Sequence, residues 1–90
     1  MPHYVYVLES VNDGDKYVGC TNNLKKRLEE HNSGKVFSTK LRKPLKLIYC
    51  EVMLNQQDAY AREKFLKTGW GKNYLKRILR NYNRSKKLGG

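Results

Sequence analysis

The stretch KYVGCTNNLKKRLEEHN, residues 16–32, carries the clearest structural signals in this 90-residue chain. Its first part, Lys16 to Cys20, is short and rich in residues that favour strands. Thr21 or Asn22 is suited to cap a helix from about Asn22 to Asn32, which Ser33-Gly34 would close. The stretch therefore predicts a strand, a tight turn and a helix.

This unit carries side chains suited to handling a phosphate. Arg27 and His31 are four residues apart, so they share one face of the expected helix, and Tyr17 lies on the strand before it. A phenol, a guanidinium and an imidazole together favour phosphate chemistry. The simpler interpretation is that Arg27 is a solvated charge and that His31 stabilises the helix end.

A second strand is predicted before this stretch. His3 to Ser10 alternates in polarity, which indicates a strand with one face on a core. Asn12-Asp13-Gly14-Asp15 predicts a hairpin turn, because these residues tolerate the positive φ of such turns. Tyr6 and Tyr17 should therefore come close across the two strands.

The segments after residue 32 complete an α+β fold. A loop (35–43) should lead to a third strand (45–53), then to a helix (56–68) capped by Asn55, and to a third helix in which residues 70–82 turn an apolar face to the domain. The order β-β-α-β-α-α predicts a three-stranded β-sheet flanked by helices. We expect one domain over residues 1–84 and a frayed tail over 85–90.

The net charge of +11 is concentrated in the second half of the chain. From Gly71 to the end there are seven basic residues and no acidic one. Such a field recruits polyanions, nucleic acid before an anionic membrane, although basic residues also serve solubility. The cations expected to bind nucleic acid are Lys26, Lys40, Arg42, Lys72, Lys76 and Arg80.

The sequence contains no apolar run of the length that a bilayer requires, and it begins directly with a strand pattern. We therefore expect a cytoplasmic protein with no membrane partner. Cys20 and Cys50 have no Cys or His neighbour at a zinc spacing. Both should be reduced thiols with no metal role.

Glu63 is the acidic residue that suggests metal chemistry. It lies between Arg62 and Lys64 in the second expected helix, and Mg²⁺ is commonly held by one carboxylate together with phosphate oxygens and waters. Arg27 would then neutralise phosphate charge, and Tyr17 or His31 would take a proton from water. Alternatively Glu63 pairs with Arg62 or Lys67, a contact worth roughly half a kcal/mol.

At these residues the chain resembles the GIY-YIG nuclease family, in particular its small stand-alone bacterial members. Residues 4–6, Tyr-Val-Tyr, stand where the first signature triplet is expected, and residues 17–19, Tyr-Val-Gly, stand at the second. Arg27, His31 and Glu63 follow in the family's order. The resemblance runs from Tyr4 to about Leu79, and Tyr4 replaces the glycine of the first triplet.

The resemblance implies an endonuclease that hydrolyses DNA phosphodiester bonds with one divalent ion, Mg²⁺ or Mn²⁺. It assigns Glu63 to the metal, Arg27 to the phosphate and Tyr17 to the general base, while Tyr6 and His31 orient water or phosphate. Many members also use an asparagine after the glutamate, and here Asn73 is preferred over Asn81 and Asn83.

Two functions are therefore in view. The first is a DNA endonuclease of repair or recombination, acting on branched, damaged or single-stranded DNA, with RNA left open and with activity that is weak or dependent on a protein partner. The second is a nucleic-acid-binding accessory module that keeps the fold without cutting. The set of Tyr6, Tyr17, Arg27, His31 and Glu63 favours the first; the missing targeting domain favours the second.

Overall fold

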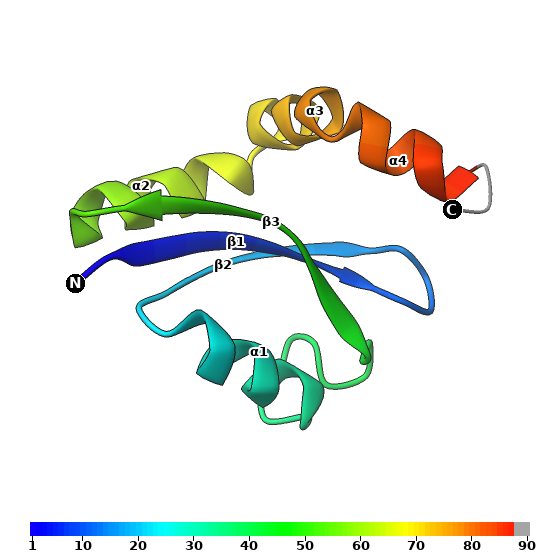
Figure 1. The fold of residues 1–90 in the computed structure, drawn as a ribbon, viewed down its shortest axis with the longest axis horizontal. Coiled ribbons are helices and arrows are strands. Elements are labelled where there is room, and N and C mark those ends of the chain that lie inside the picture. The colour runs from blue at the N-terminus through cyan, green and yellow to red at the C-terminus, as the bar shows by residue number, and fades with distance from the viewer. Residues whose placement is uncertain (88–90) are drawn as a thin grey trace.

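A computed structural model describes residues 1–87 as a three-stranded antiparallel sheet with helices on both faces (Figure 1). The elements, in chain order, are β1 (His3–Ser10), β2 (Lys16–Thr21), α1 (Leu24–Asn32), β3 (Leu45–Met53), α2 (Gln56–Leu66), α3 (Gly69–Ile78) and α4 (Arg80–Lys87). The strands lie in the order β2-β1-β3, so β1 is central. The α+β class and the three strands are thus confirmed.

β1 buries both of its faces, whereas the sequence predicted only one buried face. Val5 and Val7 pack with residues of α2 and α3, including Ala59 and Leu75. Residues on the opposite side of β1, including Tyr6, pack with Leu45 and with α1. Alternation along a strand separates the two sets. Because apolar residues occupy both, the central strand supplies two cores.

The hairpin between β1 and β2 forms at the predicted turn. Gly14 has a φ of 77°, and its N–H donates to the Ser10 carbonyl at 2.9 Å. The pairing that follows places Tyr6 opposite Gly19 and Leu8 opposite Tyr17. Tyr6 and Tyr17 therefore lie on one face of the sheet as diagonal neighbours.

The cap of α1 is Asn23, not Thr21 or Asn22 as predicted. The Asn23 side chain accepts from the Lys26 N–H at 3.1 Å. Thr21 is the last residue of β2, and its hydroxyl accepts from the Asn23 N–H. The extended strand thus moves the start of the helix to Leu24. The predicted cap of α2 is confirmed, since Asn55 accepts from the N–H groups of Gln57 and Asp58.

The third helix is interrupted, which the sequence did not predict. Leu79 leaves helical geometry and ends α3, and α4 begins at Arg80. Trp70, expected against the domain, is 79% exposed. Gly71 is buried instead. It packs so closely on the end of α2 that a Cβ there would overlap the Phe65 carbonyl and the Leu66 backbone. α3 therefore approaches α2 through a glycine, and this approach leaves Trp70 exposed.

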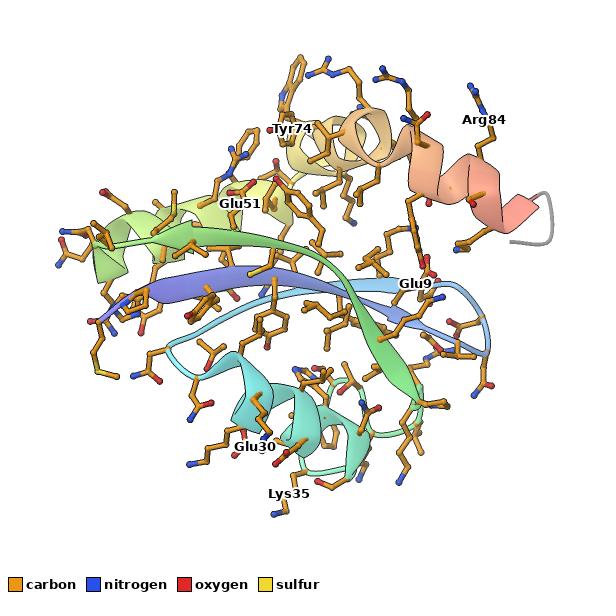
Figure 2. All side chains as sticks on the ribbon, viewed as in Figure 1. Glu9, Glu30, Lys35, Glu51, Tyr74 and Arg84 are labelled. Atoms are coloured by element: carbon orange, nitrogen blue, oxygen red, sulfur yellow. The ribbon has the colours of Figure 1, made fainter. Side chains whose placement is uncertain are left out.

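A buried carboxylate joins α4 to the sheet. Glu9 lies on β1, on the side of the sheet that faces α4 (Figure 2), and is 2% exposed. Its carboxylate accepts from the Tyr82 hydroxyl at 2.7 Å and pairs with Lys16 and Lys86. We expected the chain to fray from Ser85, but α4 remains helical to Lys87, with Lys86 in this cluster. The rest of the predicted tail, residues 88–90, lies outside the described residues.

Replacing Glu9 should loosen α4. Burial raises the pKa of the Glu9 carboxyl, but the hydrogen bonds from Lys86, Tyr82 and Lys16 outweigh burial and lower it overall. Glu9→Gln should reduce the free energy of unfolding by about 1.5–3 kcal/mol, the range for hydrogen bonds to charged groups. Urea unfolding measures the change. Glu29→Gln, on the exposed side of α1, is the control and should be neutral.

Candidate active site

A cleft of about 790 Å³ opens along the free edge of β2. α1 and the loop after it form one wall of the cleft, and α2 and α3 form the other. Tyr6, Tyr17, Arg27, His31 and Glu63 all line it, although they come from four different elements. The structure thus brings together five of the residues that the sequence predicted as catalytic candidates.

Gly19 leaves room for the Tyr6 hydroxyl. The two residues are paired across β1 and β2, and a Cβ on Gly19 would overlap the Tyr6 hydroxyl and ring. The absence of a side chain at Gly19 allows the phenol to extend across β2 to the wall formed by α1. The Tyr6 hydroxyl therefore reaches the cleft although 3% of the residue is exposed.

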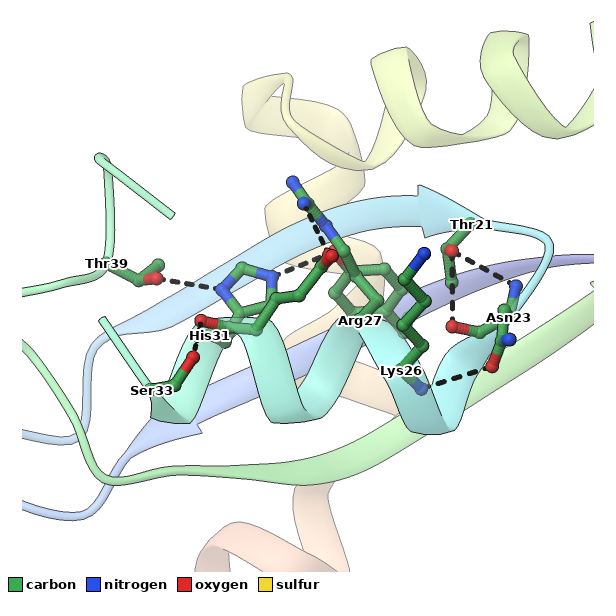
Figure 3. A network of polar contacts seen from close by, with 9 residues as sticks. Thr21, Asn23, Lys26, Arg27, His31, Ser33 and Thr39 are labelled. Carbon is green, nitrogen blue, oxygen red and sulfur yellow. Dashed lines mark hydrogen bonds and ion pairs between the residues drawn. The ribbon is translucent and has the colours of Figure 1, made fainter. Parts of the chain in front are cut away.

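His31 connects Tyr6 to the loop after α1 (Figure 3). Its Nε2 lies 3.0 Å from the Tyr6 hydroxyl and its Nδ1 lies 2.8 Å from the Thr39 hydroxyl. Burial, and then the neighbouring Arg27 cation, lowers the pKa of the imidazole. The ring is therefore neutral near pH 7, with one nitrogen donating and the other accepting.

Arg27 is held at the mouth of the cleft. Its guanidinium donates to Glu30 Oε1 at 3.1 Å. A hydrogen bond with the Tyr6 hydroxyl, and then Glu30, raises the pKa of the Arg27 guanidinium. Burial raises the pKa of the Tyr6 hydroxyl, and Arg27 opposes this rise without cancelling it. The site thus presents a fixed cation beside a protonated phenol.

Glu63 projects from α2 into the other side of the cleft. The residue before it, Arg62, binds Glu51 of β3 through two hydrogen bonds, so it does not compete for the Glu63 carboxylate. Lys67 does pair with Glu63 at 2.9 Å, as the simpler interpretation predicted. Lys67 is more than half exposed, and such pairs contribute about 0.5 kcal/mol. This pair is weak enough for a divalent cation to displace.

The residues 1–87 contain no cluster of three or more His, Cys, Asp or Glu side chains arranged to hold a metal. Glu63 would thus act as a carboxylate ligand whose remaining coordination positions are filled by substrate phosphate and water. This donor set fits Mg²⁺ or Mn²⁺, hard cations that bind one carboxylate together with substrate phosphate and waters. It does not fit zinc, which takes three or four protein ligands.

The remaining predicted residues divide into two groups. Lys72 and Lys76 line the cleft from α3, and Lys26 lies beside Arg27 in an adjoining hollow. Asn73, Lys40, Arg42 and Arg80 are exposed and do not line the cleft. Arg42 pairs with Asp13 of the hairpin turn. Asn73 therefore lies outside the lining of the cleft.

Sequence reasoning missed the partners that hold these residues. Thr39 lies in a segment without periodicity, and its contact with His31 depends on how the loop folds back. Gly19 was interpreted as the end of a strand, whereas it makes room for Tyr6. The only signal for the Glu63–Lys67 pair was its spacing of four residues on a helix.

Comparison with known proteins now gives the family. The model of the GIY-YIG catalytic domain matches residues 2–77, which include every residue of the cleft. The chain belongs to the GIY-YIG catalytic-domain family. None of the helices within residues 1–87 has the length and apolar character needed to cross a membrane.

Three relatives of the UPF0213 group illustrate the likeness. A UPF0213 protein of Bacillus licheniformis is 46% identical over 66 residues, which cover 72% of this chain and 67% of the relative. Another, from Staphylococcus epidermidis, is 36% identical over 77 residues, which cover 84% of this chain and 93% of the relative. The solution NMR structure of UPF0213 protein BH0048 from Bacillus halodurans matches with a TM-score of 0.55 and 32% sequence identity. The match covers 87% of this chain and 85% of that protein.

The buried His31 should make stability depend on pH. The pKa of His31 is lower in the folded chain than its value of about 6.5 in the unfolded chain. Its contribution to the free energy of unfolding is therefore complete above pH 6.5 and is lost as the pH falls through the lower pKa of the folded chain. We expect acidification from about pH 7.5 to about pH 5 to reduce the free energy of unfolding less in His31→Phe than in the wild type. Urea titrations at both pH values measure this, with His3→Phe, outside the cleft, as the control. An identical pH slope in wild type and His31→Phe would contradict the assignment.

Proposed function

We propose that the chain is a metal-dependent endonuclease that hydrolyses DNA phosphodiester bonds at the β2 cleft. The observation that carries this proposal is the convergence of Tyr6, Tyr17, Arg27 and Glu63 on one open cleft in a chain of the GIY-YIG family. The cleft is open at a sheet edge, so a strand of nucleic acid has access along it. Lys72 and Lys76 on its wall supply a matching positive field.

The phosphate would bind at Arg27. Its guanidinium is already oriented by its hydrogen bond to Glu30, so less conformational entropy is lost on binding. A guanidinium also matches phosphate oxygens better than an ammonium does, because it offers paired donors in a plane. Arg27 would thus neutralise the charge that grows on the phosphate as the bond breaks.

Tyr17 is the proposed general base, and it would take a proton from the attacking water. His31 is not suited to that role, because both of its ring nitrogens are already hydrogen-bonded within the protein. It would act as a positioning residue that sets the direction of the Tyr6 hydroxyl. Tyr6 would in turn orient the water or the phosphate.

Glu63 would hold Mg²⁺ or Mn²⁺ after Lys67 is displaced. When bound, the metal would supply Lewis acidity that stabilises charge on the phosphate and on the leaving oxygen. The displaced Lys67 also lines the cleft, so its ammonium remains close to the substrate's phosphates. A role in repair or recombination, on branched, damaged or single-stranded DNA, belongs to the same proposal.

A second candidate is a nucleic-acid-binding module that does not cleave. The observation that favours it is the Glu63–Lys67 pair, in which a lysine already occupies the carboxylate that would hold the metal. Its DNA affinity would come from the same cations. The two candidates differ in what the loss of Glu63 changes.

Cleavage should depend on Glu63 and on a divalent metal. With plasmid, flapped, four-way and single-stranded DNA in Mg²⁺ or Mn²⁺, Glu63→Gln should lower the cleavage rate on the order of a hundredfold or more, because the several kcal/mol from the metal are lost. Gel assays with and without chelator measure this rate. DNA binding by Glu63→Gln should persist, since Arg27 and the lysines remain.

Glu29→Gln is the matched control, since Glu29 is an exposed carboxylate of α1 outside the cleft. It should cleave at the wild-type rate. Metal-dependent cleavage that survives in Glu63→Gln would overturn the assignment of the metal ligand. Absence of cleavage by the wild type on every substrate, with DNA binding intact, would favour the second candidate.

The affinity for DNA should fall as the salt concentration rises, with a steepness set by the number of cleft cations that contact phosphates. Lys72→Ala and Lys76→Ala should each reduce the slope of log affinity against log salt concentration by about one. Fluorescence anisotropy with a labelled duplex measures that slope. Lys46→Ala, on β3 at the other edge of the sheet, is the control and should keep the wild-type slope.

A further inference from the structure

The loop between α1 and β3 displays two large apolar side chains to solvent. Phe37 is 84% exposed and Leu41 is 86% exposed. Neither contributes to either core. Cations surround them in the sequence, at Lys35, Lys40, Arg42 and Lys43. The loop, residues 35–43, therefore combines exposed apolar side chains with positive charge. Neither apolar side chain stabilises the fold by burial.

This loop is tied to the rest of the protein along its length. The buried Thr39 hydroxyl meets His31 at 2.8 Å. The Ser10 hydroxyl and the Asn12 amide donate to the carbonyls of Arg42 and Lys43. Figure 1 shows the loop beside α1, on the side of the sheet away from α2 and α3. The loop thus presents its apolar side chains from an anchored backbone, which lowers the entropic cost of binding.

Phe37 stands at the rim of the cleft. Its neighbours Val36, Ser38 and Thr39 line the cleft, and Phe37 itself points into solvent. The Lys40 ammonium lies 5.1 Å from the centre of the Phe37 ring. An aromatic ring with a cation beside it offers a stacking surface for a base and a partner for the adjoining phosphate.

We propose that Phe37 binds an unpaired nucleobase by stacking, next to the phosphate held in the cleft, with Lys40 contacting the neighbouring phosphate. This inference rests on the proposed function and names its substrate class, nucleic acid with unpaired bases. A base inside a duplex has both of its faces stacked and offers none to Phe37. The loop thus favours single strands, flaps and junctions over plain duplex.

The charges around Phe37 argue for a polyanion in preference to a second copy of this chain. Lys35, Lys40 and Lys43 would face the same lysines in a symmetric dimer, and juxtaposed like charges are costly. A nucleic acid strand brings both the phosphates that match the lysines and the flat apolar bases that match Phe37.

The test compares bases with a bare backbone. A labelled twelve-nucleotide thymidine strand and a fully abasic strand of equal length carry the same phosphates, so any difference in affinity reports on the bases. Without divalent metal, we expect the wild type to bind the thymidine strand about tenfold tighter than the abasic strand, and Phe37→Ala to bind both within about twofold. Fluorescence anisotropy measures the four affinities.

Phe37→Trp should restore the preference, since it retains an aromatic face. Leu54→Ala is the matched control, because Leu54 is also 84% exposed but lies between β3 and α2. It should keep the wild-type preference, and affinity for a plain duplex should be unchanged in Phe37→Ala. Urea unfolding verifies that the variants are folded.

Equal affinity of the wild type for thymidine and abasic strands would overturn the proposal. So would a preference that survives in Phe37→Ala, or a dimer that depends on Phe37 and leaves strand binding unaltered. Because binding is measured without metal, a failure of cleavage does not affect this result. If the wild type shows no preference for the thymidine strand but cleaves with metal, the stacking role alone is overturned and the proposed nuclease function stands.

Discussion

The burial of β1 on both faces is the constraint on which the rest of the structure depends. Val5 and Val7 hold α2 and α3 on one side, and Tyr6 and Leu8 hold α1 on the other. Removing this much apolar surface from water is the main favourable term for a chain of this size. Glu9, at the far end of the same strand, binds α4. One strand thus positions every helix.

This arrangement also explains how the cleft is assembled. The α1 side of the sheet contributes Arg27 and His31, and the other side contributes Glu63. The two sets meet because β2 is an edge strand, beyond which no further strand separates them. Both sets act on the Tyr6 hydroxyl: burial raises its pKa most, Arg27 lowers it and Glu63 raises it. A cleft at an open edge suits a long polymer substrate better than a small molecule in a closed pocket.

Hydrogen bonds among residues that line the cleft set the direction of the candidate side chains. The Tyr6–His31–Thr39 chain joins a strand, a helix and a loop through two hydrogen bonds within the protein. Its components are buried, so a change in any one would leave a partner unsatisfied. The same chain anchors the loop that displays Phe37. The hydrogen bonds that orient Tyr6 therefore also hold the loop that carries Phe37.

Local periodicity and residue type were enough to predict the strands, the hairpin turn and the first two helices to within two residues. Together with the family resemblance, they also identified Tyr6, Tyr17, Arg27, His31 and Glu63, which line the cleft. Tertiary structure decided the rest. α3 meets α2 at Gly71 and leaves Trp70 exposed, and the helix ends at Leu79; the apolar periodicity of residues 70–82 signals neither. Thr39 became a partner of His31 through loop packing, and Asn73 lay away from the cleft. Such contacts join residues whose spacing in the chain carries no signal, so only the packed structure reveals them.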